Sequence, residues 1–164
     1  MHETPEDLKS LQDLLDATYA KAGEHTLSIH TPNWRLSAEQ VVEKLTGMCV
    51  LVLATVDSDG RPFVSPVDSF FYRGRFIFGS SPTSLRARHI RNRRDVSASH
   101  VRGEELAVTV HGRAEDLKKE TDWALGYKQV IADNYGEAGV DEFWMNAPYW
   151  VIEPRKMFAL APVT

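Results

Sequence analysis

Three short apolar stretches joined by tight turns constrain the fold of this chain more than any other feature. Residues 49–56 are apolar and rich in β-branched side chains, and the turn-forming residues 57–60 follow them directly. The returning stretch 62–71 alternates its apolar side chains between two faces, and a tight connection at 72–74 leads to the third stretch, 76–78. Strands joined by so few residues pair in antiparallel fashion, because a parallel pair needs a long crossover. The pattern therefore predicts an antiparallel meander rather than a βαβ unit.

The rest of the chain predicts more short strands and a set of helices around them. Further strands are expected at 95–100, 106–116, 149–153 and 156–160, the last two around Pro154. Helices are expected at 5–22, 38–46, 82–92, 118–133 and, as a short stretch, 139–145, whereas residues 23–36 look irregular. This order predicts a mainly β fold of the α+β class, a Greek-key-like antiparallel barrel with peripheral helices. We expect residues 1–47 to form an N-terminal helical extension and residues 48–164 to form the barrel domain of a single globular unit.

The composition argues against several classes of protein. Hydrophobic residues make up 43% of the 164 residues and charged residues 26%, which is typical of a globular chain. A net charge of −4 argues against broad nucleic-acid binding, and no apolar run reaches the roughly 18 residues that would span a membrane. The acidic N-terminus lacks the features of a secretion signal, and the single cysteine, Cys49, cannot form an internal disulfide. We therefore expect a cytoplasmic protein in which Cys49 is inert packing.

The strongest candidate for a binding site is the segment that follows the third strand. Residues 79–84 read Gly-Ser-Ser-Pro-Thr-Ser, and an arginine-rich helix follows them. We expect Ser81 to cap this helix and Pro82 to occupy its first position. Four hydroxyl groups lie beside the helix start, those of Ser80, Ser81, Thr83 and Ser84. With the guanidinium of Arg86 they suit a phosphate group, and the alternative is a well-capped helix with a solvated basic face.

Other kinds of chemistry have less support in the sequence. The six histidines show no metal-ligand spacing, and neither HExxH nor CxxC occurs, so no metal site is predicted. Asp68 and His111 could serve a hydrolytic triad, but the chain has no GxSxG nucleophile motif. We expect most of the four tryptophans in the core or in dimer contacts, with one or two able to wall a flat cofactor.

Five segments carry a resemblance to a known family through their joint order and spacing. They are Leu53–Pro62, Val64–Val67, Phe76–Ser81, Arg86–Ile90 and Val110–Glu115. In this order they resemble the pyridoxamine 5′-phosphate oxidase-like family of flavin and deazaflavin split barrels, although each motif alone is loose. The resemblance covers about residues 49–116, which is under half of the chain.

The resemblance implies a six-stranded split barrel that forms a homodimer, with two cofactor sites shared across the interface. In such proteins the second strand lies along the flavin ring, a role that falls on Val64, Ser65, Pro66, Val67 and Asp68. The turn after the third strand binds ribityl and phosphate oxygens, which points to Gly79, Ser80 and Ser81. A basic residue early in the next helix binds the phosphate, and Arg86 matches it. The hydroxyl of Ser84 completes the predicted cofactor-binding set.

The chain also departs from the pyridoxamine-phosphate oxidases themselves. Asp68 falls where they place a lysine, and Leu85 and Ala107 fall near positions where they carry a basic and a polar residue. Their C-terminal substrate-binding segment has no evident match, so we do not expect oxidation of pyridoxamine phosphate. An acid beside the ring disfavours an anionic reduced flavin, but it can accept a hydrogen bond.

The leading prediction is a homodimeric oxidoreductase that binds FMN and passes hydride between it and a small organic substrate. The cofactor performs the chemistry, so no catalytic side chain is named. One alternative is a reductase that uses the deazaflavin F420, whose longer anionic tail would engage Arg88, Arg91 and Arg93. Another is a haem-binding or haem-degrading barrel with His100 or His111 as axial ligand. A non-catalytic flavin carrier or sensor is the third.

Overall fold

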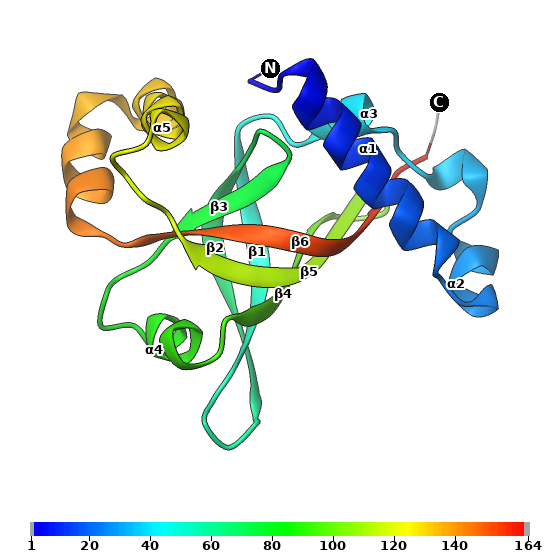
Figure 1. The fold of residues 1–164 in the computed structure, drawn as a ribbon, viewed down its shortest axis with the longest axis horizontal. Helices are drawn as coiled ribbons and strands as arrows, with labels where there is room; N and C mark the ends of the chain where they lie inside the picture. Colours follow the sequence, from blue (N-terminus) through cyan, green and yellow to red (C-terminus); the bar gives the residue numbers. More distant parts are fainter. Residues whose placement is uncertain (1, 163–164) are drawn as a thin grey trace.

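A closed barrel of antiparallel strands forms the centre of the computed structural model, which describes residues 2–162 (Figure 1). The strands follow one another around the barrel in the order β1-β2-β3-β6-β5-β4. Their bounds are Met48–Val56 (β1), Pro62–Tyr72 (β2), Arg75–Gly79 (β3), Asp95–Arg102 (β4), Leu106–Asp116 (β5) and Tyr149–Leu160 (β6). The predicted mainly β barrel with peripheral helices is therefore confirmed.

The first three strands form the predicted antiparallel meander. Buried and more exposed side chains alternate along β1, which pairs with β2 over its whole length. In the turn between them, Oδ1 of Asp57 accepts hydrogen bonds from the backbone N–H groups of Asp59 (2.9 Å) and Arg61 (2.8 Å). Gly60 adopts a φ of 86°, a conformation that glycine tolerates best. Local turn chemistry thus sets the register of this pair.

β3 is short, and this leaves two strand edges without a strand partner. It pairs with β2 only between Ser69 and Tyr72, and with β6 only between Tyr149 and Val151. Both neighbours continue beyond it, so residues 62–68 of β2 and 152–159 of β6 have one edge that no other described strand joins.

The N-terminal segment covers the free edge of β6. Thr18 Oγ1 accepts a hydrogen bond from the backbone N–H of Met157 at 3.1 Å. The hydroxyl of Tyr19 accepts from the N–H of Ala159 and donates to its carbonyl oxygen, both at 3.2 Å. The backbone N–H of Leu36 donates to the same oxygen at 3.1 Å. Groups of the N-terminal segment therefore satisfy this edge at Met157 and Ala159.

Helices gather at both ends of the long axis, with α1 to α3 at one end and α4 and α5 at the other (Figure 1). Their bounds are Pro5–Ala20 (α1), Glu24–Ile29 (α2), Pro32–Trp34 (η1), Ala38–Lys44 (α3), Leu85–Asn92 (α4), Asp122–Gly139 (α5) and Val140–Trp144 (η2). Two expectations were wrong: residues 23–36 contain α2 and η1, and the helix expected at 118–133 starts at Asp122 and continues to Gly139. Gly136, at a φ of 70°, redirects the chain within this helix.

The expected break of the last strand at Pro154 was also wrong, because β6 is continuous. Opposite it, the register of β5 shifts between His111 and Gly112, and Gly112 faces Pro154. Proline has no N–H to donate, so an irregularity at this point avoids a missing ladder bond. A Cβ atom at Gly112 would lie 2.1 Å from the carbonyl oxygen of Glu153, so no larger residue fits there without a shift of the backbone.

Two buried clusters hold these elements together. One fills the barrel and includes Leu11 and Leu15 of α1, and the other lies between α5 and the outer side of β2, β3 and β6.

Cys49 belongs to the cluster that fills the barrel, and its side chain is 2% exposed. Burial raises the pKa of its thiol to about 11, as its predicted packing role requires. None of the helices between residues 2 and 162 combines the length with the apolar character that a membrane span requires.

We expect Gly112→Ala to lower the free energy of unfolding by about 1–3 kcal/mol, the usual cost of forcing extra atoms into a packed site. Urea unfolding followed by circular dichroism measures this change. Gly23→Ala is the matched control, because a Cβ atom at Gly23 meets no atom within 4 Å. Equal stability of the two variants would contradict the close packing of β5 against β6.

Candidate functional site

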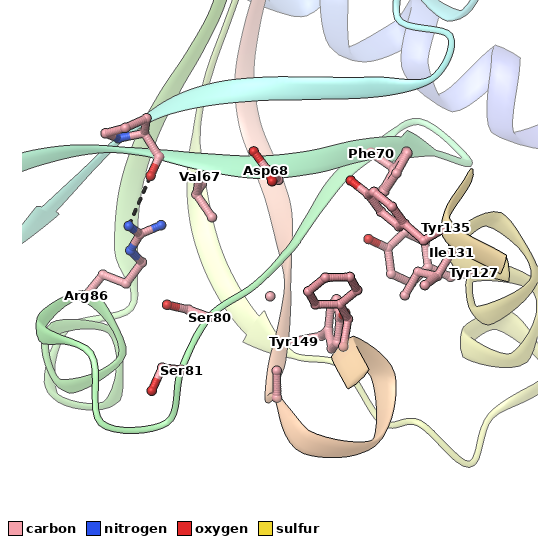
Figure 2. Close-up of a pocket in the computed structure, with 14 residues that line it drawn as sticks. Val67, Asp68, Phe70, Ser80, Ser81, Arg86, Tyr127, Ile131, Tyr135 and Tyr149 are labelled. Carbon is pink, nitrogen blue, oxygen red and sulfur yellow. Dashed lines mark hydrogen bonds between the residues drawn. The ribbon is translucent and has the colours of Figure 1, made fainter. Parts of the chain in front are cut away.

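A cleft of about 470 Å³ opens on the outer side of β2, between the segment that starts α4 and the α5–η2 pair (Figure 2). Its volume lies in the range of sites for small organic ligands. One side of the cleft is polar and the other is lined by aromatic rings. Arg86 stands at the polar end in Figure 2, and Asp68 lies between it and the rings.

The floor of the cleft is the free edge of β2. The carbonyl oxygen of Pro66 points to this edge and accepts a hydrogen bond from Nη2 of Arg86 at 3.0 Å. Backbone groups alternate sides along a strand, so those of Val64 and Asp68 face the same edge. Pro66 has no N–H, so its place leaves no unpaired donor. A ligand in the cleft can therefore meet backbone groups that no described strand uses.

The start of α4 differs from the sequence prediction. Ser84, not Ser81, is the N-cap: its Oγ accepts from the backbone N–H of Ala87 at 3.2 Å, and the helix begins at Leu85. Residues 81–84 form a turn instead, in which the N–H of Ser84 donates to the carbonyl of Ser81 at 3.1 Å. Both residues are good caps, and the Ser84 hydroxyl is the one that reaches a free helix N–H.

Arg86 is a half-buried arginine with most of its donors free. Its hydrogen bond to Pro66 uses one of five N–H groups, and among residues 2–162 it has no acidic partner. Burial lowers the pKa of its guanidinium, which still stays charged at neutral pH. A partly desolvated guanidinium without an acid is suited to bind an anion.

The structure places all of the predicted cofactor-binding residues around two neighbouring cavities. The large cleft is lined by Pro66, Val67, Asp68, Gly79, Ser80, Ser81 and Arg86. A neighbouring cavity of about 240 Å³ is lined by Val64, Ser65 and Ser84, together with Arg86. The two cavities adjoin at Arg86, which lines both of them. They are also linked by Ser80 and Ser84, whose hydroxyl oxygens are 2.9 Å apart.

Sequence reasoning missed the aromatic wall of the cleft. It is formed by Phe70, Tyr127, Tyr135, Phe143 and Tyr149, with Ile131. Tyr127 and Ile131 share one stripe of α5, which the sequence does signal, but Tyr135 and Phe143 lie beyond or outside the expected end of that helix. Burial raises the pKa of Tyr149 to about 12 and that of Tyr127 well above its usual value, so both phenols are neutral.

A buried polar pair in the smaller cavity also escaped the sequence analysis. Thr55 Oγ1 and Nδ1 of His89 are 2.9 Å apart, and both side chains are buried. Their ends line the cavity beside Ser84 and Arg86. This pair positions α4 against β1, next to the hydroxyl and guanidinium groups of the predicted phosphate site.

The two histidines considered as haem ligands lie elsewhere. Nδ1 of His100 is 2.9 Å from the carbonyl oxygen of Val50, and Nδ1 of His111 is 2.8 Å from the hydroxyl of Ser97. Neither histidine lines the two cavities that Arg86 joins. Among residues 2–162, no group of three or more histidine, cysteine or acidic side chains could hold a metal ion.

Comparisons with known proteins agree with this architecture. A family model described as pyridoxamine 5′-phosphate oxidase matches residues 37–162. A conserved hypothetical protein from Mycobacterium tuberculosis has 17% identity and a TM-score of 0.66, covering 80% of this chain and 89% of that one. The haem storage protein HutZ from Vibrio cholerae has 20% identity and a TM-score of 0.63, covering 77% and 95%. No curated protein sequence matches the chain, and at these identities the structures establish a shared fold.

We expect Ser84→Ala to lower the free energy of unfolding by about 1 kcal/mol, because it removes the N-cap of α4. Ser81→Ala should change it by less than about 0.5 kcal/mol, since its exposed hydroxyl caps no helix. Chemical denaturation of both variants measures the difference. A larger loss of stability for Ser81→Ala than for Ser84→Ala would show that Ser81 caps the helix, as the sequence alone predicts.

Proposed function

We propose a function from the premise that the chain belongs to the pyridoxamine 5′-phosphate oxidase family of split barrels. Its cleft binds FMN, and the protein works as an oxidoreductase on a small organic substrate. The observation that carries this proposal is that a polar end with Arg86 and a wall of aromatic rings flank the free edge of β2 in one cleft. FMN combines a phosphate group, which suits the Arg86 end, with a flat ring, which can lie along the free edge of β2 between that end and the aromatic residues.

The residues of the cleft fit the chemical groups of FMN. Arg86 and the hydroxyls of Ser80, Ser81 and Ser84 would hold the phosphate and ribityl oxygens, since they offer a free guanidinium and clustered hydroxyls. The backbone of β2 between Val64 and Asp68 would lie along the ring. Bound FMN supplies hydride transfer, while the chain binds and orients it.

Asp68 shapes the electrostatics of the proposed site. Its carboxylate lines the cleft, beside the β2 backbone that would lie along the ring. A fixed negative charge opposes the build-up of further negative charge beside it and repels an anionic substrate. Pyridoxamine phosphate carries such a phosphate, so we infer a substrate that is not a phosphate ester.

We also propose that the protein is a homodimer. The outer face of β1 and its neighbours exposes Met48, Val50, Val52, Val64 and Val101, each more than 40% exposed. No helix of the described chain covers these side chains, and adjacent apolar residues of this kind mark an interaction surface. Val64 also lines the smaller cavity, so a second copy on this face would border the cofactor site.

The absorption spectrum of the purified protein, before and after addition of FMN, F420 or haem, tests the cofactor. We expect the two-band spectrum of a bound flavin and thermal stabilisation by FMN that exceeds that by the other two ligands. A single deazaflavin band would indicate F420 instead of FMN, and a sharp Soret band would indicate haem. Reduced, FMN-loaded protein that no organic acceptor reoxidises faster than oxygen does would indicate a carrier rather than an enzyme.

We expect Arg86→Ala to weaken FMN binding by about 1.5–3 kcal/mol, or roughly 10- to 150-fold, the scale of hydrogen bonds to a charged group. Quenching of flavin fluorescence during titration measures the affinity. Arg88→Ala is the matched control, because Arg88 lies exposed on the same helix and lines neither cavity. Equal FMN affinity of the two variants would show that Arg86 does not bind the phosphate.

A further inference from the structure

Asp68 lines the cleft with an exposed carboxylate that forms no salt bridge within residues 2–162. Other acids near the barrel pair with arginine, for example Asp7 with Arg73 at 2.7 Å. Within residues 2–162, Asp68 has no cation at salt-bridge distance, although Arg86 lines the same cleft. Arg86 donates to the Pro66 carbonyl instead. The cleft therefore holds a negative and a positive group that do not neutralise each other by contact.

A continuous row of aromatic rings borders the side of the cleft next to Asp68. Ring centroids are 5.4 Å apart between Phe143 and Tyr135, 5.8 Å between Tyr135 and Phe70, and 6.3 Å between Phe70 and Tyr127. Phe70 and Tyr127 are buried and form the base of the row. Tyr135 and Phe143 are 40% and 41% exposed, so their rings offer surface to a ligand.

Asp68, on β2, and Tyr135, on α5, line the same cleft. Burial raises the pKa of the Tyr135 phenol, and the negative charge of Asp68 raises it further. The phenol is therefore a neutral hydrogen-bond donor beside a carboxylate. Aromatic faces attract organic cations, and a carboxylate among them strengthens this preference.

We propose that the substrate of the cleft is an organic cation, a protonated amine on a flat apolar body. Asp68 binds the positive group, and the rings of Tyr135 and Phe143 contact the apolar body. This inference rests on the proposed function, because it gives the Arg86 end of the cleft to the cofactor phosphate. The inference specifies the charge and the shape of the substrate, which family membership and the fold do not determine.

Three probes with the same ring and different charge test this proposal: benzylamine, benzyl alcohol and benzoate. FMN-loaded protein is titrated with each, and the change in flavin absorbance or the heat of binding is measured. We expect benzylamine to bind at least about tenfold more tightly than benzyl alcohol, the effect of one charge-assisted hydrogen bond. Benzoate should bind most weakly of the three.

Two variants separate the contributions of charge and ring. Asp68→Asn should abolish the preference for benzylamine over benzyl alcohol, and Tyr135→Ala should weaken both probes while the preference persists. Asp133→Asn is the matched control, because Asp133 is exposed on α5 and pairs with Gln129 rather than the cleft. It should behave as the unchanged protein does.

The outcomes distinguish this inference from the proposed function. Tight FMN binding without any preference for benzylamine, or with a preference that Asp68→Asn retains, would overturn the cation proposal and leave the cofactor assignment intact. If FMN does not bind, the proposed function fails, and calorimetry of the unloaded chain with the same probes decides the charge preference. Absence of binding by all three probes in both forms also overturns the proposal.

Discussion

β3 pairs with only the last few residues of β2, and the position of the cleft follows from this short pairing. Because β3 ends at Gly79, the chain leaves the sheet there and returns as α4 beside the unpaired part of β2. The contact of Arg86 with the Pro66 carbonyl fixes the helix against that strand. The hydroxyl-rich turn, the guanidinium and the free backbone edge are thus brought together by the length of one strand.

The other wall comes from the segment inserted between β5 and β6. α5 packs on the outer side of the barrel through the cluster that contains Phe70, Ile77 and Tyr149. The conformation of Gly136 then redirects the chain so that η2 returns towards the sheet. Gly139 lets the part of α5 after Gly136 lie close to the part before it, because a Cβ atom at Gly139 would lie 2.2 Å from the Cβ of Tyr135. Packing by an insertion therefore supplies the aromatic side of the site.

Local sequence patterns predicted the meander, the bounds of β5 and the residues at the polar end of the cleft. Turn-forming residues and the alternation of apolar with polar side chains can be recognised from neighbouring positions. The start of α4 was not predictable, since Ser81 and Ser84 are both residues that favour the N-cap position, and in the structure Ser84 is the cap. The continuity of β6 at Pro154 depends on a distant residue, Gly112. Likewise, the ring of Tyr135 packs on Phe70 of the distant strand β2, and the ring of Phe143 packs on Tyr135.

The two unpaired strand edges are protected by different means. The β6 edge is occupied by side chains of α1, whereas the β2 edge is left accessible for a ligand. An exposed edge of this kind invites pairing with a strand of another molecule, the first step of edge-to-edge aggregation. Pro62 and Pro66 share the parity of residues that face this edge, so neither presents an N–H there. The prolines that leave room for a ligand therefore also guard the chain against misassembly.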